Sequence, residues 1–385
     1  MLKRFGLVLM AGCSLSIMNG TYAEINLNGF ATIAGGRTLS DDDALNGYDD
    51  KFSFDSGSLV GLQAQSDLGD GLSATAQIIA RGEDQWEAKF EWAFVGYRFN
   101  ENIKLLVGRQ RIPYYNFSDY LDVGYAYHWI RPPEEVYSLP FDSLDGIGAL
   151  VTNSLGPVES TFHFLYGRTR DELTIGGAPA RIDSSDQMSL AWSLTRDWFT
   201  LRLGYAQSDL MIDSQTIETI AASWVQAGFP QFSDPISITD DDNTGQFIDA
   251  GFTIDKDNLL VVVEYTETDL EGTPLTDKKE AYYGSLGYRV GTVMPHITFG
   301  YTENTPGDTR FLDVVPDGVS DGLDALKAGT RALFNGSESE NEYITVGTRW
   351  DFHPAAALKV EYTTFDDKLE DSTDSLVRFA ISTVF

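Results

Sequence analysis

Apolar and polar residues alternate along the final segment of the chain, residues 375–385. Val377, Phe379, Ile381 and the terminal Phe385 fall on one face of an extended chain, whereas Arg378 falls on the other. Because side chains alternate across a β-strand, this pattern predicts a strand with one apolar face. The segment has about the 9–11 residues that a tilted strand needs to cross a membrane. An ordinary edge strand of a soluble sheet is the alternative for this segment alone.

The same period-two pattern recurs through the chain and predicts about sixteen strands. In one of them, Phe90, Trp92 and Phe94 are expected on the face opposite Glu91. The predicted strands are 25–38, 58–68, 72–81, 86–99, 103–110, 146–152, 158–169, 187–195, 199–207, 246–254, 258–268, 280–290, 292–302, 342–352, 355–365 and 375–385.

The connections between these strands alternate between short turns and longer loops. The short turns fall near Gly69, Glu101, Ser154, Asp197, Lys256, Gly291 and His353. Short periplasmic turns and long outer loops are typical of bacterial transmembrane barrels, which have an even number of strands. We therefore predict an all-β fold, a closed antiparallel transmembrane β-barrel of about 16 strands, forming a single domain from residue 24 to 385.

Residues 1–23 have the organisation of a secretory signal peptide. Lys3 and Arg4 precede an apolar stretch, and Ala23 ends a small-residue exit. We expect cleavage near Ala23. The alternative is a lipoprotein signal with Cys13, the only cysteine, as the lipidated residue. Cleavage near Ala23 leaves a cysteine-free chain, so hydrogen bonding within a large sheet must replace disulfide bonds.

Composition narrows the class of protein. The 385-residue chain has a formal net charge of -31, which argues against nucleic acid or anionic lipid as partners. Beyond the N-terminus we find no apolar run near the roughly 20 residues of a membrane helix. Only helices and closed barrels satisfy the backbone in lipid, so any membrane crossing must use strands.

Signals for catalysis or for metal and cofactor binding are weak. The four histidines, His128, His163, His296 and His353, show no helix-type ligand spacing, and no nucleophile elbow or phosphate loop occurs. We predict no enzyme activity, no cofactor and no metal site. A hydrolase built on inward-facing His163 and weak calcium binding by the aspartate runs 41–43 and 240–242 are the alternatives.

Basic side chains on the predicted strands are the most informative charges. On a lipid-facing surface each would cost about 2–4 kcal/mol near the membrane midplane, so a barrel requires them to face the lumen. Inner-face acids such as Asp249, Glu264 and Glu361 are candidate partners for about half of them. The predicted lumen-facing basic residues are Arg81, Arg202, Arg289, Arg349, Lys359 and Arg378.

This organisation resembles the Gram-negative porin family: a signal peptide, sixteen strands, a long third outer loop and a terminal Phe. The step Arg109-Gln110-Arg111 resembles the start of the third loop in several porins, and Pro140-Phe141-Asp142-Ser143 is a loose match to the loop signature. The resemblance implies that loop 111–145 folds into the lumen and narrows it. Arg109 then joins the pore-lining basic residues. The expected constriction acids are Asp119, Asp122, Glu134, Glu135, Asp142 and Asp145.

The resemblance also implies a function and partners. It implies passive diffusion of small hydrophilic solutes and ions through the outer membrane, a homotrimer, and contact with outer-membrane lipid and lipopolysaccharide. The final strand, with Phe379, Ile381 and Phe385, would be read by the barrel-assembly machinery. Acids on the loop and basic residues on the wall would create a transverse field in a narrow pore.

Two other functions fit the same barrel. The first is a substrate-specific channel for sugars or dicarboxylates, in which tyrosines of the third loop stack on sugar rings. Those tyrosines are Tyr114, Tyr115, Tyr120, Tyr125 and Tyr127. The second is a barrel whose long outer loops serve mainly as an adhesin or phage receptor.

Overall fold

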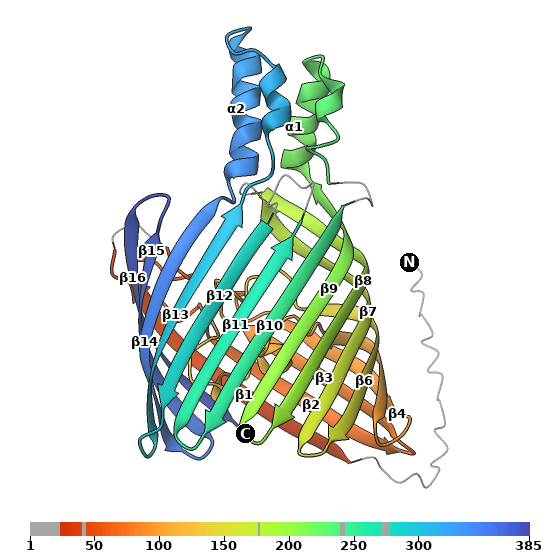
Figure 1. The fold of residues 1–385 in the computed structure, drawn as a ribbon, viewed down its shortest axis with the longest axis vertical. Coiled ribbons are helices and arrows are strands. Elements are labelled where there is room, and N and C mark those ends of the chain that lie inside the picture. The colour runs from red at the N-terminus through yellow and green to blue at the C-terminus, as the bar shows by residue number, and fades with distance from the viewer. Residues whose placement is uncertain (1–23, 41–43, 176–177, 239–242, 271–277) are drawn as a thin grey trace, which may run out of the picture.

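Sixteen antiparallel strands form one closed barrel, so the predicted fold class is confirmed (Figure 1). The computed structural model describes residues 24–40, 44–175, 178–238, 243–270 and 278–385. Each strand pairs with its neighbours in sequence, and β1 pairs with β16 to close the sheet. The predicted signal peptide with Cys13 and both aspartate runs lie outside the described residues.

The strand bounds extend several of the predicted segments. The strands are β1 Ile25–Thr38, β2 Leu59–Gly69, β3 Leu72–Arg81, β4 Ala88–Arg98, β5 Ile103–Arg111, β6 Ser143–Leu155, β7 Val158–Ile175, β8 Ala178–Arg196, β9 Phe199–Ser214, β10 Thr244–Lys256, β11 Leu259–Asp269, β12 Lys278–Tyr288, β13 Val293–Thr305, β14 Ser339–His353, β15 Ala356–Asp367 and β16 Ser372–Val384. The helices are α1 Gln215–Gln226 and α2 Asp321–Asn335, with short 3-10 helices at Ser118–Tyr120, Gly124–Ala126, Pro230–Phe232 and Arg310–Val314.

The outer face of the barrel is apolar. Leu105, Ile147, Val263, Ile297 and Val346 are among the large hydrophobic side chains exposed on it. A wall of this kind suits contact with hydrocarbon rather than water, because transfer of apolar surface out of water is favourable. Neither α-helix in the described part of the chain is long and apolar enough to cross a membrane.

The two ends of the barrel sheet meet at the C-terminus. The Phe385 N–H donates to the Gly29 carbonyl at 2.9 Å, and the Gly29 N–H donates to the Phe385 carbonyl at 2.7 Å. The Phe385 ring lies over Gly29, where an added Cβ would stand 2.1 Å from the ring. Closure removes the free strand edges on which sheets otherwise aggregate.

A β-bulge in β4 changes one predicted face. Gln77 of β3 pairs with Trp92, but the next residue, Ile78, pairs with Phe90, so Glu91 is the extra residue. The bulge separates aromatic residues that simple alternation places together. Phe90 is exposed on the outer face, whereas Trp92 lines a cavity on the lumen side with Gln77.

Two helical segments stand above one end of the barrel, and the sequence pattern did not predict them (Figure 1). We call residues 215–238 and 306–338 the helical cap. Trp224 of α1 donates from Nε1 to Thr330 Oγ1 of α2 at 2.8 Å, and both helices bury apolar residues in one cluster that includes Phe334. The Ser320 hydroxyl accepts from the Leu323 N–H and caps the start of α2.

The barrel wall is taller on one side. Strands β7, β8 and β9 contain 18, 19 and 16 residues, whereas β2, β3, β4 and β5 contain 9 to 11. Helix α1 rises from the taller side because it follows β9 directly, whereas α2 lies between β13 and β14.

Candidate functional site: a loop fixed inside the barrel

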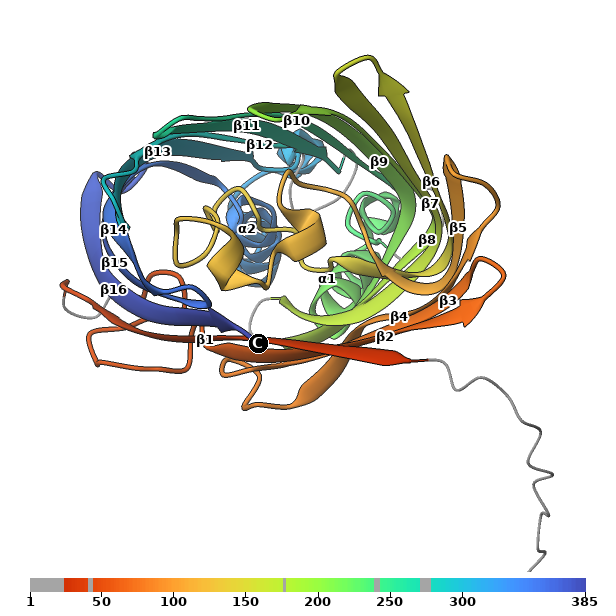
Figure 2. The ribbon, with the colours of Figure 1, turned by 90° about the horizontal axis from the view of Figure 1, so that it is seen from below.

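The segment between β5 and β6, residues 112–142, lies inside the barrel, and we call it the lumen loop (Figure 2). Aromatic rings attach it to the inner wall. Tyr114 and Tyr115 pack against Phe247 of β10 at ring distances of 5.1 and 5.3 Å. Trp129 packs edge-on against Tyr283 of β12 at 5.6 Å. Contacts of this geometry contribute stabilising free energy beyond that of the apolar area each ring buries, so the loop has fixed packing partners.

Lys359 of β15 is the most deeply buried basic residue of the wall, with 0% of its surface exposed. Its ammonium group donates to the carbonyl oxygens of Gly124 and Trp129. The same nitrogen lies 4.8 Å from the Tyr127 ring centre, a cation–π distance. Lys359 therefore holds two turns of the lumen loop at one point.

Two wall arginines also bind backbone carbonyls of the loop. Arg349 donates to the carbonyls of Tyr125 and Tyr127, both at 2.8 Å. Arg202 donates to the Pro113 carbonyl. A guanidinium group presents several donors in a fixed plane, which suits carbonyls from successive turns of a loop.

Asp122 is the best-paired acid of the lumen loop. Its carboxylate lies 2.9 Å from Arg81 and 2.5 Å from Arg111. Glu91, the bulged residue of β4, pairs with the same two arginines at 2.5 and 3.2 Å, and Asp142 lies 3.1 Å from Arg111. Burial raises the pKa of Asp122, but the charges of Arg111 and Arg81 outweigh burial and hold that pKa below its ordinary value.

A second ion-pair cluster joins the loop to the closing strand. Arg378 of β16 pairs with Glu134 of the loop at 3.1 Å and with Glu361 of β15 at 3.2 Å. The other oxygen of Glu361 accepts from the Ile130 N–H at 2.8 Å. The charges of this cluster are thus in direct contact and do not face one another across open water.

The remaining two acids of the loop lie in different surroundings. Glu135 accepts from the Asn46 amide at 3.2 Å, and burial, followed by the charge of Glu134, raises its pKa. Asp119 is exposed and lines a cavity of about 450 Å³ with Gln63 and Gln77.

Arg109 and Asp145 are corrections to the predicted site. Arg109 shares the face of the exposed residues Leu105 and Val107 on β5, and Asp145 shares the face of exposed Ile147 on β6. The two side chains pair at 2.9 Å, with 40% and 63% of their surfaces exposed. Both side chains therefore project to the outer face, and Arg109 also borders the cavity of about 500 Å³ that Arg81 and Asp122 line. Asp145 also belongs to β6, since the loop ends at residue 142 and not at 145.

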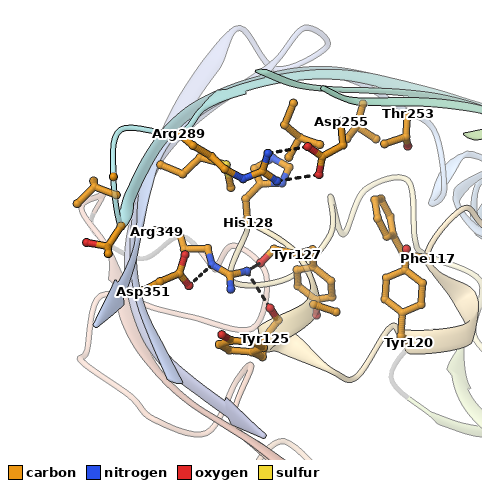
Figure 3. A pocket seen from close by; sticks show the side chains of 17 residues that line it. Phe117, Tyr120, Tyr125, Tyr127, His128, Thr253, Asp255, Arg289, Arg349 and Asp351 are labelled. Carbon is orange, nitrogen blue, oxygen red and sulfur yellow. Dashed lines mark hydrogen bonds and ion pairs between the residues drawn. The ribbon is translucent and has the colours of Figure 1, made fainter. Parts of the chain in front are cut away.

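Arg289 lies at the end of the barrel opposite the cap, in a cavity of about 430 Å³ (Figure 3). It pairs with Asp255 through two hydrogen bonds of 2.6 and 2.7 Å. Arg349, in the same cavity, pairs with Asp351 at 2.8 Å. Each of these arginines has its own carboxylate, so the cavity carries little net charge.

The tyrosines of the lumen loop are mostly unavailable for stacking on a solute. Tyr114, Tyr115 and Tyr127 are 4–5% exposed because they pack between the loop and the wall. Tyr120 and Tyr125 line the cavity beside Arg289. Burial raises the pKa of Tyr120 to about 12, so its hydroxyl stays protonated at neutral pH.

Two histidines on the lumen side have different surroundings. Nε2 of His163 is buried and has no hydrogen-bond partner in the described part of the chain, so this nitrogen is not bonded to a serine hydroxyl. His128 of the lumen loop does bond Ser285 Oγ at 2.8 Å, and that hydroxyl also bonds Thr298 at 2.8 Å. Burial lowers the pKa of His128, which keeps the ring neutral. No group of three or more His, Cys, Asp or Glu side chains among these residues could hold a metal ion.

Sequence reasoning missed three residues that attach the loop. Arg111 and Glu91 complete the cluster around Asp122. Alternation already placed Glu91 opposite the aromatic residues, but no sequence signal indicated that it pairs with Arg81 and Arg111. Glu264 was considered only as a partner for arginine. It accepts instead from the Asn116 N–H at 2.7 Å and from the Tyr137 hydroxyl at 2.6 Å.

Comparison with known proteins extends the description of the fold. No protein-family model and no curated protein matches the chain. Among solved structures, it is similar to OmpF of Salmonella typhi, solved in complex with daunomycin, with 14% identity and a TM-score of 0.58 over 94% of this chain and 98% of that one. The anion-selective porin of Comamonas acidovorans is also 14% identical, with a TM-score of 0.58 over 94% of this chain and 100% of that one. The outer-membrane channel DcaP of Acinetobacter baumannii is 14% identical, with a TM-score of 0.57 over 95% of this chain and 98% of that one.

These similarities and the geometry define the class of the molecule. It is a closed 16-stranded β-barrel with the fold of outer-membrane porins, and a loop is fixed inside its lumen. The resemblance drawn from the sequence is thus confirmed at the level of the fold.

Proposed function

We propose that the protein is a channel in the outer membrane of a Gram-negative bacterium, through which small hydrophilic solutes and ions diffuse passively. The observation that carries the proposal is the combination of an apolar outer wall with a polar lumen that a fixed loop partly fills. No bond is made or broken in this function, so the lumen needs no reactive group.

Two cavities support a path past the loop. One, of about 500 Å³, is lined by Arg81, Glu91 and Asp122. The other, of about 450 Å³, is lined by Gln77, Trp92 and Asp119. Both are bordered by residues of β3 and β4 and reach the same short stretch of the lumen loop, residues 119–123. We propose that solutes pass along this wall, where Asp119 is an exposed acid of the lumen loop.

The sequence led us to expect a transverse field between acids of the loop and basic residues of the wall. We propose that this field is weak, because these charges are paired. The loop acids Asp122, Glu134 and Asp142 touch arginines directly. Of the other wall cations, Arg202, Arg349 and Lys359 bind loop carbonyls, and Arg289 pairs with Asp255. Paired charges at contact distance produce a small field beyond their immediate surroundings. We propose that these wall residues position the loop, and that Asp119 and the net negative charge of the chain favour cations.

The proposed partners follow from the same fold. We propose a homotrimer, as in the solved trimer form of OmpT from Vibrio cholerae, with which this chain shares 13% identity and a TM-score of 0.54. Lipid and lipopolysaccharide would contact the outer wall. Barrel-assembly machinery would read the final strand, on which Phe379 and Ile381 face outward.

The test is conductance across planar bilayers under a potassium chloride gradient. Refolded protein should open discrete, ohmic channels with a zero-current potential that indicates cation preference. The absence of channels from protein whose barrel is folded by circular dichroism would overturn the proposal.

A second function is favoured by one observation, the helical cap. A packed helical surface above the barrel could serve as a receptor for phage or for another cell. Deleting residues 215–238 would then abolish attachment and leave conductance unchanged.

A further inference from the structure

Inner-face residues near the cap are apolar, unlike those deeper in the lumen. Ile182 of β8 and Leu210 and Ile212 of β9 are buried in the cluster that holds Trp224 and Phe334 of the helical cap. Lower positions on the inner wall carry amides, hydroxyls and charges instead. The apolar core of the cap therefore continues down into the mouth of the barrel.

Part of this apolar surface is left uncovered and forms a half-open cavity of about 130 Å³. The lumen loop contributes Leu139 and Phe141, and the wall contributes Ala206, Leu210 and Phe247. Among the described residues, no charged side chain lines the cavity. The amide of Gln187, at its edge, already donates to the Tyr114 hydroxyl at 2.6 Å.

A single stretch of chain separates this cavity from the charged cavity of about 500 Å³ lined by Arg81, Glu91 and Asp122, which we call the vestibule. Leu139, Pro140 and Phe141 line the apolar cavity on one side and the cavity of about 500 Å³ on the other. In that larger cavity acidic side chains outnumber basic ones, and Asp171 and Glu172 are exposed at its rim. A molecule spanning both spaces would meet an apolar wall at one end and water with negative charge at the other.

We propose that this cavity is a binding subsite for small amphiphiles that carry one aromatic or aliphatic ring and a neutral or positively charged polar group. The volume supports a ring of this size, since an apolar cavity of about 150 Å³ lined by Leu, Ile and Phe binds benzene. The acidic vestibule favours a neutral or cationic group over a carboxylate. The inference rests on the proposed channel function and names a class of solute for it.

The experiment measures current through the full-length protein in planar bilayers during titration with benzylamine, benzyl alcohol and benzoate. Ethanolamine and ethanol are the ringless controls. Benzylamine and benzyl alcohol should reduce the current saturably, whereas the ringless compounds and benzoate should not. Saturation-transfer NMR on the protein in nanodiscs provides a second readout, because it detects ligand binding without requiring an open channel.

Two variants locate the site. Ala206→Leu fills the cavity and Leu139→Ser removes part of its apolar wall, and each should weaken block by benzyl alcohol by about tenfold. Thr195→Leu is the matched control, because it places the same leucine side chain on the exposed inner face of β8 beside the turn at 197–198. The serine variant tests the site independently if leucine at 206 prevents folding.

The outcomes separate the two proposals. Normal conductance with no difference between benzyl alcohol and ethanol, or equal block in all three variants, overturns the subsite. Failure to conduct at all overturns the channel, while NMR still decides whether the ring binds.

Discussion

Asp119 and Asp145 show how placement decides what a charged residue can do. Both were expected at the constriction, but Asp119 lines the lumen, whereas Asp145 pairs with Arg109 on the outer wall. Alternation from Leu105 and Val107 already indicates an outward Arg109. The porin-like step Arg109-Gln110-Arg111 suggested the opposite. At this position the strand pattern was the better guide, because the pleat leaves a side chain only two directions.

Replacing Asp119 with asparagine should reduce cation preference. A unit charge about 4 Å from an ion in water contributes about 1 kcal/mol, so we expect the cation-to-anion permeability ratio to fall by about twofold to fivefold. The zero-current potential in a potassium chloride gradient measures this ratio. Asp145→Asn is the control and should leave the potential unchanged; a larger shift from Asp145→Asn would contradict the outward placement.

Glu135→Gln should make the fold less sensitive to pH. Burial raises the pKa of Glu135 in the folded protein, so the folded state binds a proton more tightly than the unfolded state. Stability from this group therefore increases as pH falls through the folded pKa and is lost as pH rises. We expect the glutamine variant to melt at an equal or higher temperature at pH 7, with a smaller gain between pH 7 and 5. Melting curves for Glu134→Gln, which removes an ion pair to Arg378, should show the opposite change at pH 7.

The lumen loop shows how far sequence reasoning reaches for a whole element. Strand number and the inward direction of Lys359 and Arg378 follow from the period-two pattern. The contacts of these residues with the loop do not, because they join segments more than 200 residues apart. The bulge at Glu91 and the two cap helices were missed, since a single inserted residue and helices within long loops leave a weak periodic signal.

Lys359→Met should loosen the lumen loop. The change leaves two buried carbonyls without their donor, and each such group costs about 1–3 kcal/mol, so we expect a loss of about 2–4 kcal/mol of stability. Denaturant unfolding in lipid vesicles measures the loss, and single-channel recordings should show added current noise. Lys104→Met, on the inner face of β5 near the turn at 99–102, is the control. Unchanged current noise together with unchanged stability would show that Lys359 does not hold the loop.

Gly29→Val should impair closure of the barrel. An added Cβ would stand 2.1 Å from the Phe385 ring, so the terminal aromatic must move away from β1. We expect a marked drop in the yield of folded barrel, seen as loss of the heat-modifiable band on gels. Gly284→Val provides the comparison, because a Cβ at Gly284 meets no atom within 4 Å. Equal yields from the two variants would argue against a role for this contact.

At the scale of the whole molecule, the helical cap and the mouth of the barrel share one apolar cluster. Trp224 and Phe334 of the cap pack in it with Ile182 of β8 and with Leu210 and Ile212 of β9. The barrel below this cluster is held by a continuous ladder of strand pairs. The strand ladder is therefore expected to be independent of the cap, so that damage to the cap leaves the ladder intact.

Trp224→Ala tests this independence. Truncating a buried tryptophan typically costs about 3–5 kcal/mol, which exceeds what two short helices can lose and remain packed. We expect proteases added to intact cells to cut within 215–238 or 306–338 in the variant, with conductance and barrel melting unchanged. Val225→Ala, on the exposed side of α1, is the matched control. Collapse of the whole barrel in the tryptophan variant would show that the two parts fold as one unit.

The unequal height of the wall affects how molecules at the cell surface reach the barrel. An 18-residue strand is about 60 Å long and, tilted by about 45°, climbs about 40 Å, well beyond a hydrophobic band of about 25 Å. Large particles such as antibodies or virions therefore contact the tall side of the barrel, formed by β7–β9, first. In the proposed channel, small solutes would enter most readily over the lower side formed by β2–β5, so substitutions there would change solute entry without altering the tall side.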